Sequence, residues 1–153
     1  MKKLIGTMLA ACSLFITSNS LAQNSLSGNK DLRGLQRVLV VVTPENETQK
    51  FSPIISLELR KAGLKIAQNK GELGGGDGVI WVTIKTNAYP RNAYVEWNLL
   101  QQATLTRTKE SQSVITWRHV DDRRDVNPSS EIDSMVRSSV DLFLNAWLGA
   151  NGR

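Results

Sequence analysis

The chain contains one cysteine, Cys12, and one histidine, His119, among its 153 residues. A single cysteine excludes a disulfide within the chain and a metal site built on several thiolates. A Ser-His-Asp site would have to use His119, and no serine is flanked as Gly-x-Ser-x-Gly. Long apolar runs are also lacking, because residues 4–16 are interrupted by polar residues and glycine. A transmembrane helix needs about 20 apolar residues, so we expect no transmembrane segment.

The N-terminus has the three-part layout of a secretory signal peptide. Two lysines follow Met1, the apolar stretch Leu4–Ile16 comes next, and small and polar residues complete the segment. Ser20-Leu21-Ala22 places small residues at the two positions that a signal peptidase reads. We therefore predict a signal peptide over residues 1–22, cleavage between Ala22 and Gln23, and a periplasmic or secreted protein.

A second cleavage point competes with the first. Leu9-Ala10-Ala11-Cys12 matches the motif after which bacteria attach lipid to a cysteine. Cleavage before Cys12 would leave a short apolar region, Leu4–Ala11, and an apolar stub, Leu14–Ile16, on the mature chain. We favour cleavage after Ala22, and a membrane-tethered lipoprotein remains the alternative.

The composition of the remainder is that of one ordinary domain. Removal of residues 1–22 leaves 131 residues and lowers the net charge from +5 to +3. The remaining charges are mixed in sign, which disfavours a nucleic acid partner. The partner considered is an envelope protein. Residues 23–36 are predicted to form a polar leader, and residues 37–151 a single α+β domain.

Residues 37–67 predict a β-α-β unit. The β-branched run Arg37–Val42 is typical of a buried strand. Ser52-Pro53 predicts a helix start, with serine as N-cap and proline at the first helical position, and Gly63 predicts its end. Leu64–Ala67 then predicts a second strand. The apolar side of the helix is expected to comprise Ile54, Ile55, Leu57, Leu59 and Ala62.

Three further strands are predicted at Val79–Thr86, Ala93–Thr106 and Ser113–Arg118. Their alternation predicts an antiparallel meander with one buried and one largely wet face. Gly74–Gly78 precedes a strand rather than a helix, so we interpret it as a connection and not as a phosphate-binding loop.

A final amphipathic helix is predicted, with Ser129 or Ser130 as N-cap and Asn151-Gly152 at its end. Its apolar stripe comprises Ile132, Val136, Val140, Phe143 and Trp147. The predicted fold is α+β: a single two-layer domain with a mixed sheet and both helices on one face.

Three segments carry a resemblance to a known group of proteins. Asp31–Leu35, Leu57–Ile66 and Val140–Asn151 resemble a family of small secreted bacterial proteins, largely uncharacterised. The element order is also similar to the periplasmic TolB N-terminal and CsgG-like domains of cell-envelope assembly factors. The resemblance implies an α/β fold and a place in the envelope, and its motifs are structural rather than chemical.

The segment His119–Asp125 is the candidate for chemistry. His119, Asp121, Asp122 and Asp125 could bind a hard metal or act as acid and base. Two arginines neutralise part of this charge, so we interpret the segment as a solvated loop and expect no catalytic residue, metal or cofactor. A small hydrolase or a metal-dependent enzyme remains the alternative.

The tryptophans predict a binding surface. Trp97, Trp117 (grouped with Ile115) and Trp147 are expected in the core. Trp81 alternates out of phase with the apolar residues of its strand, which places it on the open face near Tyr94 and Leu100. Exposed aromatic residues among polar neighbours are favoured binding anchors. We therefore predict a non-catalytic binding module that uses Trp81, Tyr94 and Leu100, the alternative being that Trp81 packs against the glycine loop or the leader.

Overall fold

The computed structural model describes residues 32–88 and 91–153. The predicted signal peptide, both cleavage points and the leader up to residue 31 lie outside the described residues. The elements are, in chain order, β1 (Arg37–Thr43), α1 (Glu45–Lys61), β2 (Lys65–Ile66), the 3-10 helix η2 (Lys70–Glu72), β3 (Gly78–Ala88), β4 (Arg91–Thr104), β5 (Ser111–Arg124) and α2 (Pro128–Ala150).

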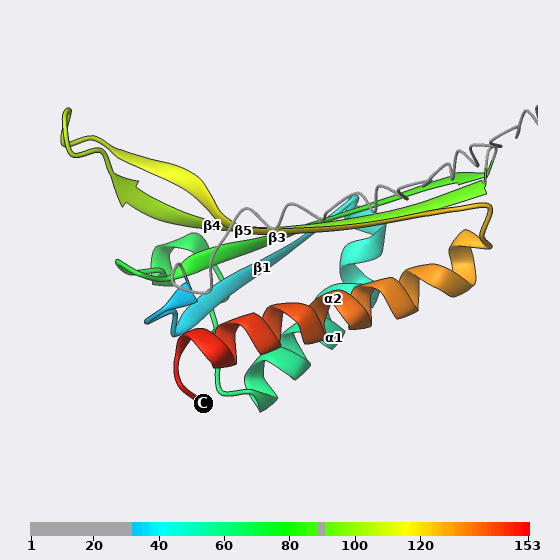
Figure 1. The fold of residues 1–153 in the computed structure, drawn as a ribbon, viewed down its shortest axis with the longest axis horizontal. Coiled ribbons are helices and arrows are strands. Elements are labelled where there is room, and N and C mark those ends of the chain that lie inside the picture. Colours follow the sequence, from blue (N-terminus) through cyan, green and yellow to red (C-terminus); the bar gives the residue numbers. More distant parts are fainter. Residues whose placement is uncertain (1–31, 89–90) are drawn as a thin grey trace, which may run out of the picture.

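The strands form one sheet in the order β2-β1-β3-β4-β5. β1 pairs in parallel with both β2 and β3, whereas β3, β4 and β5 pair antiparallel. Both α-helices lie on the same side of the sheet (Figure 1). This arrangement confirms the predicted α+β domain with a β-α-β start, an antiparallel meander and a C-terminal helix.

The core lies between the helices and the face of the sheet that they cover. Trp97 from β4 and Phe143 from α2 lie at its centre, with ring centroids 6.4 Å apart, and Trp117 meets Phe143 edge-on at 5.2 Å. Trp147 is also buried, and its indole Nε1 donates to the carbonyl of Leu35 at 2.9 Å. The expectation that these three tryptophans belong to the core is confirmed.

The packed region begins before β1. Leu32 and Leu35, assigned to the leader in the sequence analysis, are fully buried. The side-chain amide of Asn151, at the end of α2, donates to the carbonyl of Leu32 at 3.1 Å. The segment before β1 is thus fastened to the C-terminal end of the last helix.

Helix α1 begins seven residues earlier than Ser52, so the predicted helix start is wrong. Its N-cap is Pro44, and the Oγ1 of Thr48 donates to the carbonyl of Val42 at 2.8 Å. Pro53 lies inside the helix on an exposed side, where its missing N–H leaves the carbonyl of Gln49 free to reach water. The buried residues of α1 are Phe51, Ile55, Ser56 and Leu59, whereas Leu57 is 51% exposed, which corrects its assignment to the apolar side.

Strand β5 extends to Arg124, so the predicted loop at residues 119–125 is wrong for all but its last residue. The register shifts between Leu99, paired with Trp117, and Leu100, paired with Ile115. Thr116 is the extra residue of this bulge, and it changes the alternation of β5. Ile115 therefore faces away from the core and is 57% exposed, which corrects its grouping with Trp117.

Helix α2 is capped by neither predicted serine. Asn127 is the N-cap, and its Oδ1 accepts from the backbone N–H of Ser129 at 3.2 Å. Pro128 then takes the first helical position, where a missing N–H costs nothing. The predicted apolar stripe of this helix is buried throughout.

Candidate functional site

The face of the sheet that α1 and α2 leave uncovered, here called the open face, carries a row of apolar side chains that crosses four strands. The register aligns Leu39 with Val79, Val79 with Leu100, and Leu100 with Ile115. Directly paired residues project to the same side of a sheet, so the four side chains lie on one line. Trp81, paired with Val41 in β1, adds an indole that is 39% exposed. We call Leu39, Val41, Val79, Trp81, Leu100 and Ile115 the apolar row.

A groove of about 510 Å³ opens beside this row. Val79, Trp81 and Leu100 line it from the sheet, and residues 70–78 form its other wall. Gln102 and Ser113 lie at its rim and are hydrogen-bonded to each other at 2.9 Å. The groove is thus a largely apolar concavity with a few polar groups, the composition typical of binding sites.

The glycine-rich wall is held by specific contacts. Asp77 Oδ2 accepts from the N–H of Gly74 at 2.8 Å, and Gln101 Nε2 donates to the carbonyl of Gly76 at 3.2 Å. Gly78 starts β3, and a Cβ there would lie 2.7 Å from Leu99 Cδ1. The contacts of Gly74 and Gly76 therefore hold the loop beside the groove, whereas glycine at position 78 leaves room for Leu99 in the core. The segment connects η2 to β3, consistent with the predicted connection.

The structure brings together two of the three residues proposed for binding. Trp81 and Leu100 both line the groove, whereas Tyr94 lies farther along the same face, opposite Lys85. The hydroxyl of Tyr94 donates to Glu96 Oε2 at 2.8 Å, and Lys85 Nζ lies 5.5 Å from the ring centroid. Tyr94 thus belongs to a polar part of the open face.

That polar part has a defined protonation state. Glu96 accepts from Tyr94 and forms an ion pair of 2.9 Å with Arg118. Burial alone would raise the pKa of Glu96, but hydrogen bonds from Tyr94 and Asn98 and the charge of Arg118 outweigh it and hold that pKa below its ordinary value. Burial, followed by the contact with Glu96, raises the pKa of Tyr94. Glu96 is therefore ionised and structurally engaged at neutral pH.

The four residues considered for catalysis or metal binding do not converge. Alternation along β5 places His119 and Asp121 on the helix side and Asp122 on the open side. Asp125 follows the strand in a left-handed conformation with φ 57° and is exposed. Within residues 32–88 and 91–153, no group of three or more potential metal ligands is found.

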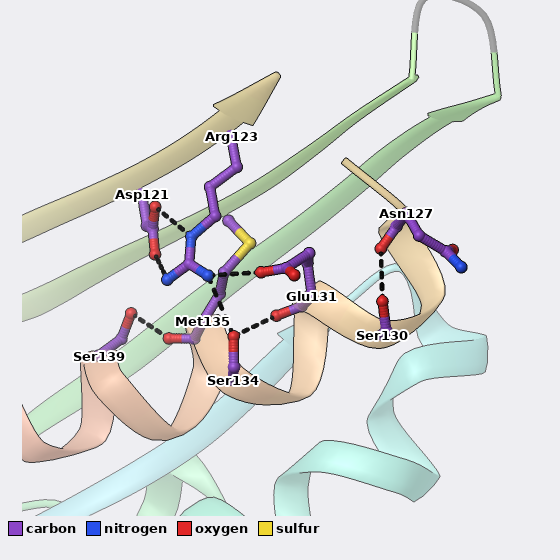
Figure 2. Close-up of polar contacts among 8 residues, drawn as sticks. All are labelled: Asp121, Arg123, Asn127, Ser130, Glu131, Ser134, Met135 and Ser139. Atoms are coloured by element: carbon purple, nitrogen blue, oxygen red, sulfur yellow. Dashed lines mark hydrogen bonds and ion pairs between the residues drawn. The ribbon is translucent and has the colours of Figure 1, made fainter. Parts of the chain in front are cut away.

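Asp121 is engaged by Arg123, as Figure 2 shows. Arg123 donates to both carboxylate oxygens of Asp121, at 3.3 and 3.0 Å, to Glu131 at 2.6 Å and to Ser134 at 3.1 Å. Hydrogen bonds to Asp121 and Glu131 raise the pKa of Arg123. These contacts of Arg123 join β5 to the first turns of α2, so Asp121 and Arg123 stabilise the fold.

His119 lies against Trp117, with ring centroids 6.2 Å apart. Burial lowers the pKa of His119, and the charge of Asp121 offsets this only in part. The imidazole is therefore neutral at pH 7.

Sequence reasoning missed four members of the apolar row, of which Val79 lies on the face of Trp81 by simple alternation. Leu39 and Val41 lie in a continuous apolar run, whose faces cannot be assigned without the register. Ile115 was assigned to the opposite face because the bulge at Thr116 leaves no signal in the residue pattern.

The comparisons with known proteins concern the fold alone. No protein-family model and no curated protein matches the chain. A PelC dodecamer from Paraburkholderia phytofirmans is 15% identical with a TM-score of 0.39, over 68% of this chain and 84% of that one. The lipoprotein GNA1162 from Neisseria meningitidis is 13% identical with a TM-score of 0.37, over 71% and 96%. The rare lipoprotein B from Shewanella oneidensis is 15% identical with a TM-score of 0.32, over 75% and 92%.

These likenesses are distant, and two of the three structures are named as lipoproteins. Among the described residues, neither helix has the length and apolarity required to span a bilayer.

Proposed function

We propose that this protein is an exported, non-catalytic binding module of the bacterial cell envelope, which holds a partner protein against the open face of its sheet. The observation that carries the proposal is the apolar row, with the groove at Trp81 beside it. The row crosses the sheet from β1 to β5, and we take this length to match the contact surface of a partner protein.

Exposure along the row supports this assignment. Trp81 is 39% and Ile115 is 57% exposed, and the side chains between them are half-buried. Isolated exposed apolar residues are common on soluble proteins, but contiguous apolar patches rimmed by polar groups mark interaction sites. The indole of Trp81 is the natural anchor, because tryptophan is enriched among residues that dominate binding energy.

The polar residues of the molecule favour binding over catalysis. His119 packs on Trp117, Asp121 is held by Arg123, and Glu96 is held by Tyr94 and Arg118. A general base must reach a substrate in a concave site, and these groups serve packing and ion pairs instead.

Photocrosslinking in the native host tests the binding surface. A photoreactive amino acid replaces Ile115, at the end of the row, and in a matched control it replaces Leu57, which is 51% exposed on α1. We expect a discrete adduct with one envelope protein from position 115 and none from position 57. Adding Trp81→Ala should then reduce the adduct at position 115.

Equal labelling from both positions would contradict the proposal, as would labelling at position 115 that Trp81→Ala leaves unchanged. Adducts only at position 57 would place the partner on the helix side.

Export rests on the N-terminal sequence, and the intact mass of the protein from its host tests it. A mass that begins at Gln23 supports a free exported domain. A mass that includes residues 1–22 without modification contradicts export with cleavage.

A tether to the membrane is the second candidate, because Leu9–Cys12 has the sequence of a lipid attachment motif. In that case the intact mass should begin at a lipidated Cys12, and Cys12→Ser should release the protein from the membrane fraction. Residues 13–31 would then separate the anchor from the packed domain.

A further inference from the structure

Among residues 32–88 and 91–153, nothing pairs with one edge of β1 for most of its length. β2 contains only two residues, which pair with Arg37 and Val38. Beyond Val38 the remaining residues of β1 pair with β3 on one side and have no described strand on the other. The sheet therefore contains an empty position next to β1, in line with β2.

The backbone groups that face this position can be identified from their hydrogen bonds. The N–H groups of Lys65 and Ala67 donate to the carbonyls of Gln36 and Val38 at 2.9 and 2.8 Å. Even-numbered residues of β1 thus direct their backbone groups away from β3, because successive residues of a strand alternate.

The same alternation applies farther along β1. The carbonyl of Val42 accepts from Thr48 Oγ1 of α1 at 2.8 Å, which confirms its direction. The N–H and carbonyl of Val40 and the N–H of Val42 point the same way, and among the described residues no hydrogen-bond partner is found for them. They form a short row of donors and an acceptor that another strand could pair with.

A groove of about 300 Å³ occupies the empty position. Val40 and Ala67 line it from the sheet, and Pro53, Ser56 and Arg60 line it from α1. Ser56 is a small residue in a buried position, so the helix leaves room for a side chain there. Arg60 is exposed and forms no ion pair with any described residue.

We propose that an extended segment of a partner protein adds to the sheet beside β1, in the position that β2 vacates. Its backbone pairs with Val40 and Val42, an apolar side chain enters the space beside Ser56, and an acidic side chain meets Arg60. Strand addition of this kind draws affinity from main-chain hydrogen bonds and specificity from pockets for alternate side chains. This groove shares only Leu39 with the apolar row, so variants at Ser56 and Arg60 test it apart from Trp81 and Ile115.

Hydrogen exchange in the full-length protein is the first test. The amides of Val40 and Val42 should exchange much faster than those of Leu39 and Val41, which belong to the pairing with β3. Equal protection of all four amides would overturn the proposal, and protection that grows with protein concentration would show that a second copy covers the edge.

Binding of a model strand is the second test. The probe is acetyl-Asp-Val-Thr-Val-Thr-Val-Thr-amide, and the control peptide has the same sequence with N-methyl groups on alternate residues, which removes its pairing donors. The probe should shift and protect the amides of Val40 and Val42, and the N-methylated peptide should not. Equal binding of both peptides, or binding of neither, would contradict strand addition.

Variants of the groove provide the third test. Ser56→Phe fills the space and should weaken probe binding at least tenfold. Arg60→Glu should weaken it about three- to fivefold, as expected for an exposed charge pair. The matched control is Arg137→Glu on α2, an exposed arginine without an ion pair to any described residue, and it should leave binding unchanged.

The Arg60→Glu arm remains informative if Ser56→Phe impairs folding, which thermal unfolding will show. An equal response to Arg60→Glu and Arg137→Glu would mean that only net charge matters and would overturn the assigned groove.

Discussion

The two faces of the sheet use the same residue type for different purposes. Trp97 on β4 faces the helices and is fully buried, whereas Trp81 on β3 faces the other way and is 39% exposed. Trp97 pairs with Val82, so the two tryptophans differ by a single step in the register. One step of alternation separates an indole that holds the fold together from one that is available to a partner.

The faces also differ in how polar groups are arranged. On the covered face, Arg123 and Asp121 lie at the end of the sheet and connect it to α2. On the open face, the ion pair of Glu96 with Arg118 lies beside the apolar row. The covered face is built for packing, and the open face combines an apolar strip with oriented charges.

The largest effect on stability should come from Trp97→Ala, compared with Trp81→Ala in a separate variant. Trp97→Ala removes a fully buried indole and should lower the free energy of unfolding by about 3–5 kcal/mol. Trp81→Ala, on the open face, should lower it by about 1 kcal/mol or less. Urea unfolding of both variants gives the comparison, and equal losses would show that the open face is also part of the core.

A smaller effect is expected at the junction of β5 and α2. Arg123→Ala removes two partly exposed ion pairs, to Asp121 and Glu131, and should cost about 1 kcal/mol. Urea unfolding measures the loss of stability. Arg124→Ala is the control, because Arg124 is largely exposed and its Nε lies as far as 4.0 Å from Asp122 Oδ2. If Arg124→Ala costs as much as Arg123→Ala, the junction contributes nothing particular.

Much of this architecture follows from local pattern. The alternation of Ile80, Val82 and Ile84 assigned the faces of β3, and the stripe on α2 assigned its buried side. Both patterns are long and regular, so tertiary packing has little to change.

The errors arose where the local signal pointed elsewhere. Ser52-Pro53 looks like a helix start, yet the helix begins at Glu45, because proline is tolerated inside a helix where the freed carbonyl faces solvent. The charges of residues 119–124 resemble a loop, but pairing with β4 makes them a strand. The bulge at Thr116 depends on the partner strand.

The candidate site was only partly predictable for the same reason. Trp81 and Leu100 follow from alternation, whereas Leu39 and Ile115 join them only through the register of four strands. The open edge of β1 depends on how early β2 ends, which composition does not reveal.

The smallest expected effect is a pH dependence on the covered face. Burial holds the pKa of His119 below that of an unfolded histidine, about 6.5, so the unfolded state takes up the proton first as pH falls. The stability that depends on neutral His119 is complete above pH about 6.5 and declines as pH falls from there through the lower folded-state pKa. Glutamine at position 119 cannot titrate, so the unfolding free energy of His119→Gln should vary less across pH 5–7 than that of the wild type.

Glu96 provides the control. Its pKa is also lowered, so its contribution to stability is lost only as pH falls below the ordinary carboxylate range, and Glu96→Gln should leave the pH 5–7 slope unchanged. A slope that persists in His119→Gln would assign the titration to another group.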